Sequence, residues 1–271
     1  MSERIDCHTH TVYSGHGVGT VEEVASAAEA AGLSTLALTE HFILPPEIDP
    51  GNDFSMSLEE LHRYRVDIER ARERHGELEI LCGVEVDWIG EPDQSRLDAL
   101  EGIEYILGSV HFIDGWAFDD PDQLPTWDDR DVDEVWRRYF EIWCEAVRSA
   151  YPFNCMSHPD LPKKFGHRPS FDTRELYEHV AQVAACAGVI VEVNTSGLRR
   201  PLHELFPGDA LLRAFCTAGV PCTIGSDAHA PQDVGSGFDE ACAAMVRAGY
   251  DQLCIPLREG GYRFVDLEGF R

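Results

Sequence analysis

Positively charged residues are scarce in this 271-residue sequence. It has 22 lysine and arginine residues against 49 aspartate and glutamate residues, which gives a formal net charge of -27 at pH 7. A surface with this charge repels nucleic acid and anionic membranes over most of its area. We therefore expect neither a nucleic-acid-binding nor a membrane-binding protein. Bound metal cations would supply local positive charge, so a small phosphate anion is still an acceptable ligand.

Ordered cysteine pairs and long apolar segments are also missing. The nine cysteines never form a C-x-x-C pair, and several lie in apolar runs, such as Cys82 in EILCGVEV, which indicates reduced, buried thiols. No stretch of about 18 apolar residues occurs that would suit a membrane span. Residues 1–10, MSERIDCHTH, contain neither an apolar signal core nor a basic amphipathic presequence. We expect a soluble, cytoplasmic protein.

Short segments rich in β-branched residues alternate with amphipathic helical segments. The expected strands are 4–8, 34–41, 78–86, 104–112, 153–158, 189–196 and 221–229. The expected helices are 21–32, 57–76, 131–150, 172–187, 208–218 and 237–248, and the longest expected loops are 42–56 and 113–130. This alternation predicts an α/β fold with a parallel sheet. About seven βα units favour one barrel domain over residues 1–271. An open doubly wound sheet stays an alternative, although no G-x-G-x-x-G motif follows the first strand.

Residues able to bind a metal ion stand at the ends of nearly all expected strands. They are His8, His10, Glu40, His41, Glu85, His111, His158, Asp227 and His229. The C-terminal ends of parallel barrel strands open onto one face, where these side chains would converge. A single buried histidine is more often a core residue than a ligand, but chance does not place six of twelve histidines at strand ends. The sequence therefore predicts a metal site.

The other histidines are expected to be ordinary surface residues, apart from His16, whose position in a loop gives no signal of its own. They are His62, His75, His167, His179 and His203.

Imidazole and carboxylate ligands without cysteine are typical of open, catalytic sites for zinc, manganese or iron. A carboxylate among several histidines can bridge two ions. Two ions a few ångström apart hold a hydroxide between them and lower the pKa of water to near neutral. The expected chemistry is hydrolysis.

Eight motifs in this chain resemble those of the polymerase and histidinol phosphatase (PHP) family, and specifically its histidinol-phosphate phosphatase branch. They are DCHTH at 6–10, SGHG at 14–17, LTEHF at 38–42, GVEVDW at 83–88, GSVHFIDGWAFD at 108–119, SHPDLPKKFG at 157–166, EVNTSG at 192–197 and IGSDAH at 224–229. The resemblance extends over essentially the whole chain. It implies a distorted (β/α)7 barrel of parallel strands, with the active site and three metal ions at the C-terminal ends of the strands.

Matched position by position, the resemblance implies three groups of ligands. They are His8, His10, Glu85 and Asp227 for one metal, Glu85, His111 and His158 for a second, and His16, His41 and His229 for a third. The family often has aspartate where Glu40 stands, so Glu40 is a candidate to support a ligand rather than to bind metal.

The implied reaction is hydrolysis of L-histidinol phosphate to L-histidinol and phosphate, a step of histidine biosynthesis. A metal-bridging hydroxide would attack the phosphorus atom, with Glu85, Asp227 and His229 as catalytic residues. Asp227 or His229 would carry the proton to the leaving alkoxide.

Loops on the expected catalytic face contain candidates for substrate binding. The basic candidates for the phosphate group are Lys163, Lys164, Arg168, Arg199 and Arg200. Acidic candidates for the amine and imidazole of the substrate include Glu47, Asp49, Asp53, Asp119 and Asp120.

Three other functions remain open. A PHP phosphoesterase could act on another small phosphate ester or a nucleotide, because the metal motifs would be shared. An amidohydrolase-like barrel would cleave C–N bonds, but such enzymes commonly carry a lysine that bridges their metals, and no lysine ends an expected strand. A non-enzymatic, metal-dependent binding module with a degenerate site is disfavoured because every ligand position is filled. The sequence leaves the oligomeric state open.

Overall fold

The computed structural model describes residues 3–267 and residue 269. The strands are β1 Ile5–Thr9, β2 Thr35–His41, β3 Glu79–Asp87, β4 Tyr105–Ser109, β5 Phe112–Ile113, β6 Trp116–Ala117, β7 Cys155–Met156, β8 Ile190–Asn194, β9 Cys222–Gly225, β10 Gln252–Pro256 and β11 Tyr262–Asp266. Seven of them form one parallel sheet in the order β1-β2-β3-β4-β7-β8-β9. β5 pairs with β6, and β10 with β11, as antiparallel hairpins.

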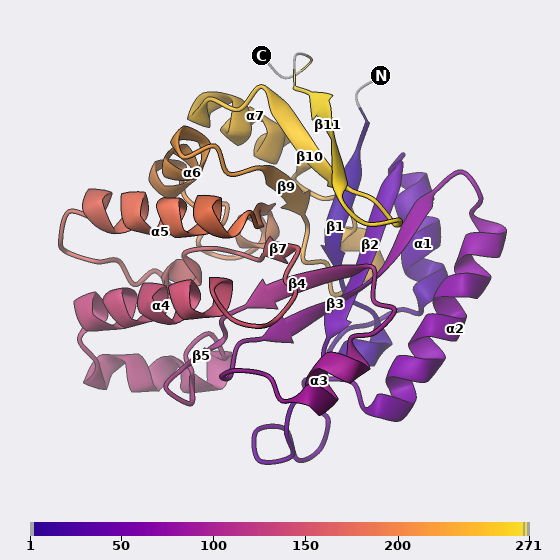
Figure 1. Ribbon diagram of the computed structural model, residues 1–271, viewed down its shortest axis with the longest axis horizontal. Coiled ribbons are helices and arrows are strands. Elements are labelled where there is room, and N and C mark those ends of the chain that lie inside the picture. Colours follow the sequence, from indigo (N-terminus) through magenta and orange to yellow (C-terminus); the bar gives the residue numbers. More distant parts are fainter. Residues whose placement is uncertain (1–2, 268, 270–271) are drawn as a thin grey trace.

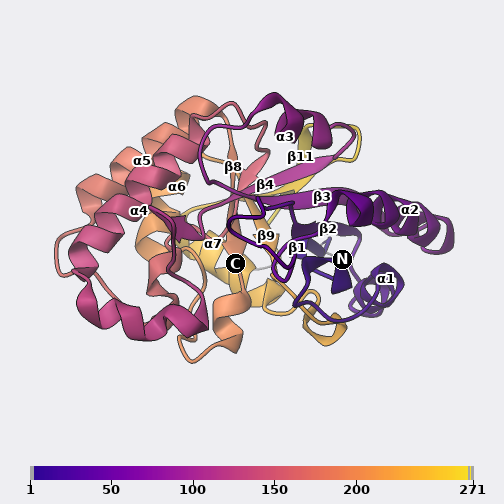
Figure 2. The ribbon, with the colours of Figure 1, turned by 90° about the horizontal axis from the view of Figure 1, so that it is seen from below.

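The parallel sheet curls into a nearly closed barrel (Figures 1 and 2). Its first and last strands come together through the segment that follows β9. The amide of His10 donates to the carbonyl oxygen of Ala228 at 2.8 Å, and the amide of Asp227 donates to that of His8 at 2.7 Å. We call this junction between residues 8–10 and 226–228 the seam of the barrel.

Helices cover the outside of the barrel. They are α1 Val21–Ala30, α2 Leu58–Arg74, α3 Gln94–Ala99, α4 Val132–Val147, α5 Arg174–Ala187, α6 Asp209–Thr217 and α7 Phe238–Ala248. The 3₁₀ helices are η1 Val12–Ser14, η2 Pro121–Asp129, η3 Leu161–Phe165, η4 Ser196–Arg199 and η5 Pro231–Asp233. Figure 2 shows α1 and α2 along one flank and α4, α5 and α6 along the other. One α-helix lies between each strand of the sheet and the next, and α7 follows β9, so the fold contains seven βα units.

Local sequence signals set the helix boundaries. Thr20 and Glu23 form a capping box at the start of α1, and Ser57 and Glu60 form one at the start of α2. In each, the side chains satisfy backbone amides that have no partner within the helix. On α4 a row of bulky side chains, including Trp136 and Trp143, is fully buried against the barrel, which fixes the inner face of that helix.

The structure confirms the predicted α/β barrel with seven parallel strands, and the open-sheet alternative is wrong. The strands are shorter than expected at the site. β4 ends two residues before His111, and β9 ends at Gly225, before Asp227 and His229. Likewise β7 ends at Met156, two residues before His158. Asp227 and His158 lie on turns because they adopt backbone conformations that a strand does not supply. Asp227 has φ 53° and His158 has φ 22°, in the left-handed region that non-glycine residues rarely adopt.

Several elements were not expected. They are the hairpins β5–β6 and β10–β11, the helix α3, and the 3₁₀ helix η2 within the predicted loop 113–130.

All nine cysteines are free, and seven are buried, whereas Cys186 is exposed and Cys216 is partly exposed. Within residues 3–267 and 269, no helix combines the length and apolar character needed to cross a membrane.

Asp6 connects β1 to the segment after β9 and so supports the seam. Its carboxylate is 1% exposed. It accepts hydrogen bonds from the amide and the hydroxyl of Ser226, at 2.8 and 2.5 Å, and from the amide of Gly235 at 2.8 Å. Buried donors that lose their acceptor keep their full desolvation cost. This carboxylate therefore joins the two sides of the seam, in addition to the backbone hydrogen bonds there.

We expect Asp6→Ala to lower the free energy of unfolding by about 3 kcal/mol, because the amides of His8, Ser226 and Gly235 and the hydroxyl of Ser226 lose their acceptor. Urea denaturation of the metal-free protein measures this loss. Asp239→Ala is the matched control, because Asp239 pairs with Arg4 at the surface, and it should leave the midpoint unchanged. Equal midpoints for the two variants would show that Asp6 does not support the seam.

Candidate metal centre

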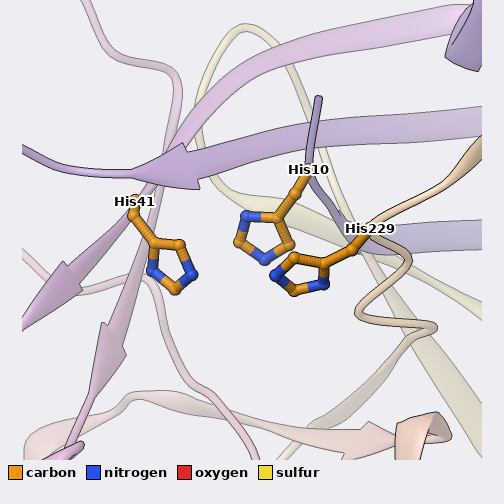
Figure 3. Close-up of side chains that lie close together, drawn as sticks. All are labelled: His10, His41 and His229. Carbon is orange, nitrogen blue, oxygen red and sulfur yellow. The ribbon is translucent and has the colours of Figure 1, made fainter. Parts of the chain in front are cut away.

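Histidines from three distant parts of the sequence meet at the C-terminal end of the barrel. Figure 3 shows His10, which follows β1, His41, the last residue of β2, and His229, from the turn after β9, with their rings close together. The ring of His10 lies 4.2 Å from that of His229 and 4.6 Å from that of His41, centre to centre. The convergence expected from the strand ends is therefore present.

Glu85, on β3, lies at the centre of this cluster and is fully buried. Its Oε2 faces three rings, with Nε2 of His8 at 3.3 Å, Nε2 of His10 at 3.5 Å and Nδ1 of His41 at 3.1 Å. Its Oε1 faces Nε2 of His158 at 2.9 Å and Nε2 of His111 at 3.7 Å. Each carboxylate oxygen thus serves a different set of histidines.

Charge in this cluster controls the protonation of Glu85. Burial would raise its pKa, but the neighbouring imidazoles of His8 and His41 hold it well below its usual value. Glu85 is therefore an anion whose two oxygens point to separate groups of nitrogen atoms, the arrangement of a bridging ligand.

The turn after β9 adds Asp227 and His229. Oδ1 of Asp227 lies 3.5 Å from Nε2 of His10 and 3.4 Å from Nδ1 of His229. The His229 side chain is 28% exposed, so it lies at the mouth of the site. The ring of His16, in the loop after β1, stacks at 4.7 Å on that of His229 and at 5.1 Å on that of His41. The structure thus brings His16 to the cluster, as the family resemblance implies.

A carboxylate on β8 fixes the orientation of His8. Nδ1 of His8 lies 2.8 Å from Oε1 of Glu192, which is fully buried. Oε2 of Glu192 also accepts the amide of His158 at 2.8 Å. Because Nδ1 is held by the carboxylate, Nε2 of His8 points into the cluster. Sequence analysis assigned Glu192 no role, although it lies in the EVNTSG motif.

A relay of hydrogen bonds fixes the tautomer of His10. The hydroxyl of Ser14 donates to Oε2 of Glu40 at 2.6 Å, so its oxygen accepts the proton on Nδ1 of His10 at 2.9 Å. The lone pair of His10 is thereby left on Nε2, which faces Glu85 and Asp227. Burial lowers the pKa of His10 to about 3, so the ring is neutral near pH 7. Glu40 lies where it supports a ring, in agreement with the expectation that it supports a ligand.

Asp87, the last residue of β3, plays the same part for His111. Its Oδ1 lies 2.7 Å from Nδ1 of His111, and Nε2 of His111 then lies 3.2 Å from Nε2 of His158. Burial opposes the charged imidazole, but the carboxylates of Asp87 and Asp119 raise the pKa of His111 to about 10. Sequence analysis missed Asp87 as well, despite its position two residues after Glu85 on the same face of the strand.

The buried nitrogens that point into the cluster are poorly satisfied. Nε2 of His8, Nε2 of His10 and Nδ1 of His41 are buried and make no hydrogen bond with the described residues, which is costly for polar atoms. Four groups of three His, Asp or Glu residues have ligand atoms within 4.8 Å of one another. Imidazole nitrogens and carboxylate oxygens of this kind suit zinc, manganese and iron. The residues present therefore fit a site for more than one divalent ion.

The basic residues proposed for phosphate binding differ in their surroundings. Nζ of Lys163 is buried and donates to Asp160 at 2.8 Å and to the carbonyl oxygen of Leu205 at 2.7 Å. These contacts occupy its ammonium group inside the protein, so the structure contradicts the expectation that Lys163 binds phosphate. Lys164 pairs at 2.8 Å with Asp119.

Burial would raise the pKa of Asp119, but the nearby positive charges of Lys164, His111 and His158 lower it below its usual value. Asp119 therefore interacts with both Lys164 and two histidines of the cluster. Arg168 is exposed and pairs with Glu204.

Arg199, at the end of η4, holds the turn that carries Asp227. It donates to the carbonyl oxygens of Ser226 at 2.8 Å and Asp227 at 3.2 Å, and to the hydroxyl of Ser236 at 2.6 Å. Its guanidinium group thus supports the left-handed turn at Asp227, a role that its position in the sequence did not indicate. The side chain of Arg200, the next residue, makes no hydrogen bond or ion pair with the described part of the chain.

The histidines expected at the surface lie there only in part. His62, His179 and His203 are exposed. His75 is buried, with 6% exposure, beside Glu22 and Glu29. The ring of His167 stacks on that of Trp127 at 4.1 Å. The expectation was wrong for His75 because the end of α2 packs against α1.

Comparison with known proteins identifies the family of this chain. The family model of the PHP domain matches residues 6–196, which contain all of the site residues above except those after β8. The chain belongs to the PHP domain family.

Two relatives and one solved structure extend this PHP assignment. A protein of Deinococcus radiodurans described as a probable histidinol-phosphatase is 36% identical over 89% of this chain and 92% of its own length. The histidinol-phosphatase of Bacillus subtilis is 27% identical over 88% of this chain and 97% of its own. The crystal structure of histidinol phosphate phosphatase from Lactococcus lactis, complexed with zinc, L-histidinol and phosphate, aligns with a TM-score of 0.77 and 21% identity. It covers 96% of this PHP chain and 99% of its own, and it establishes the fold.

We expect Arg199→Ala to accelerate amide hydrogen exchange in residues 226–236 by roughly tenfold, because hydrogen bonds from a charged donor are lost there. Exchange followed by mass spectrometry measures the change. Arg200→Ala is the matched control and should leave these amides as they are. Unchanged exchange in Arg199→Ala would rule out the support of the Asp227 turn by this side chain.

Proposed function

We propose that this chain is a metal-dependent phosphomonoesterase that hydrolyses L-histidinol phosphate to L-histidinol and phosphate. The observation that carries the proposal is Glu85, a buried carboxylate whose two oxygens face separate groups of histidines. The names of the relatives from Deinococcus radiodurans and Bacillus subtilis support the choice of substrate. The whole chain would act as one barrel domain, in the cytoplasm, in a step of histidine biosynthesis.

The proposed ligand groups are those that the family resemblance implies. His8, His10, Glu85 and Asp227 would hold one ion, Glu85, His111 and His158 a second, and His16, His41 and His229 a third. The ions would act as Lewis acids that lower the pKa of water and neutralise charge on the phosphoryl oxygens. Glu192, Ser14 and Asp87 would keep the donor nitrogens of their histidine partners aimed inward.

The remaining residues of the site have roles in binding and proton transfer. His229 lies at the mouth, with Nδ1 beside the carboxylate of Asp227, so these two residues are placed to carry a proton to the leaving alkoxide. Lys164 pairs with Asp119, whose carboxylate interacts with the charges of His111 and His158, and it is our first candidate for contact with the phosphate group. Arg168 and Arg200 are further candidates, with Arg200 free of competing contacts among the described residues.

We expect the purified, metal-loaded protein to release phosphate from L-histidinol phosphate in strong preference to p-nitrophenyl phosphate and a nucleotide monophosphate at equal concentration. A chelator should abolish the activity. Glu85→Ala should lower kcat by roughly 100-fold or more, because it removes a carboxylate at the reaction centre. Glu79→Ala, at the other end of the same strand, should retain the activity. Equal, low activity on all three esters would sink the histidinol-phosphate assignment and keep the phosphoesterase.

We also expect at least two divalent ions per chain by elemental analysis, as a bridging carboxylate requires. Glu85→Gln keeps the size of the side chain but removes its charge, so it should lose ions. Glu79→Gln is its control and should keep the ion content of the original protein. An ion content that is the same in all three proteins would contradict a bridging role for Glu85.

A further inference from the structure

Two neighbouring segments carry the histidines proposed for the second ion. His111 lies in the segment between β4 and α4, and His158 lies in the segment between β7 and α5. β4 and β7 pair through only two residues of each, 107–108 and 155–156, so both histidines lie beyond the ladder. His158 also has φ 22°, a conformation that persists only where its surroundings hold it. Contacts between the two segments must therefore set where these two rings lie.

A pair of stacked rings joins the two segments. The ring of Trp127, in η2 of the β4–α4 segment, lies 4.1 Å centre to centre from that of His167, in the β7–α5 segment, and the two planes differ by 6°. Trp127 is 2% exposed. Nε1 of Trp136, on α4, donates to the carbonyl oxygen of His167 at 3.2 Å. Both the ring and the backbone of His167 are thus held against the other segment.

The β4–α4 segment fixes the position of Trp127 by itself. Nε1 of Trp127 donates to the carbonyl oxygen of Phe118 at 2.9 Å, and its ring lies edge-on to that of Trp116 at 5.0 Å. Nε1 of Trp116 in turn donates to the hydroxyl of Thr126 at 3.0 Å, and the guanidinium group of Arg130 covers the Trp116 ring at 3.8 Å. His167 therefore packs on a ring that is already in place.

Two further contacts join the same segments closer to the ligands. The hydroxyls of Ser109, at the end of β4, and Ser157, which follows β7, lie 2.5 Å apart. The ammonium group of Lys164 pairs with the carboxylate of Asp119 at 2.8 Å. Loss of the ring contact leaves both of these contacts in place, so we expect the two segments to stay folded without it.

We propose that the stack of His167 on Trp127 positions His111 and His158 for the second ion. A contact outside the three ligand groups would then set the affinity for one ion. The inference rests on the proposed function, because the ligand group of this ion is part of that proposal. Trp127 and His167 are positioning residues, which act through the backbone of their segments and touch neither ion nor substrate.

Titration of the metal-free full chain with Co²⁺, followed by visible absorption, measures ion binding without substrate. We expect His167→Ala to weaken one ion by roughly tenfold, as the loss of support behind a ligand does, and to leave the other ions unchanged. His167→Phe keeps a flat ring on Trp127 and should restore the affinity. His179→Ala is the matched control, because His179 is an exposed histidine on α5, and it should bind Co²⁺ like the original protein.

Removal of a ligand identifies the ion that is affected. His111→Ala should lose the second ion, so the further change His167→Ala should weaken none of the ions that this variant still binds. The same tenfold loss in the His111→Ala protein would place the effect at another ion and overturn the proposal. Circular dichroism checks folding. If His167→Ala does not fold, Trp127→Phe, which narrows the stacked ring, should weaken the same ion by roughly threefold.

Kinetics separate positioning from a general loss of stability. At limiting Co²⁺, His167→Ala should lower kcat for L-histidinol phosphate and leave KM unchanged, because chains without the second ion are inactive and the others bind substrate as before. Excess Co²⁺ should restore kcat. A lower midpoint of thermal unfolding with unchanged ion affinities would show that the stack stabilises only the fold, and it would overturn the inference.

The inference and the proposed function fail in different ways. If the original protein hydrolyses L-histidinol phosphate and His167→Ala binds every ion as tightly, the positioning role is wrong and the function stands. If the original protein hydrolyses no phosphate ester but His167→Ala weakens one ion, the function is wrong and the positioning role stands. If the original protein binds no Co²⁺, both are overturned.

Discussion

The burial of Glu85 among imidazole rings is the constraint on which the site depends. A carboxylate removed from water is costly unless cations or donors surround it. Here the rings of His8, His41 and His158 surround it. Each ring must in turn present the correct nitrogen, so buried partners further out, such as Glu192 for His8, fix the orientation. Glu85 is thus surrounded by histidines, and those histidines are held by further buried residues, several of which lie on the strands.

Much of the fold followed from the sequence because its signals are local. The alternation of short apolar runs with amphipathic segments marked the seven βα units, and ligand residues at the ends of those runs marked the site. The exact ends of the strands did not follow. Whether β9 stops at Gly225 depends on the left-handed backbone of Asp227, and that conformation is stabilised by contacts with Arg199, 28 residues away in the chain.

The roles of several other residues could not be predicted from the sequence, because they depend on burial and on partners that are distant in the chain. Glu192 and Asp87 look like ordinary acidic residues, and only the structure shows the rings that they hold. Lys163 looked like a free cation in a loop, but Asp160 and a carbonyl oxygen occupy it inside the protein. His75 looked exposed because it ends an amphipathic helix. In each case a long-range contact decides the role, and no local pattern reports such a contact.

The seam of the barrel has a consequence for how the protein gains its stability. Strands β1 and β9 are joined through residues 8–10 and 226–228. The same short segments carry His8, His10 and Asp227. Closing the barrel and assembling the cluster are therefore one structural event. A ligand that binds only the assembled cluster stabilises the closed form by mass action. Binding at the site and closure of the barrel are therefore linked, so that a ligand which binds the cluster also raises the free energy of unfolding of the barrel.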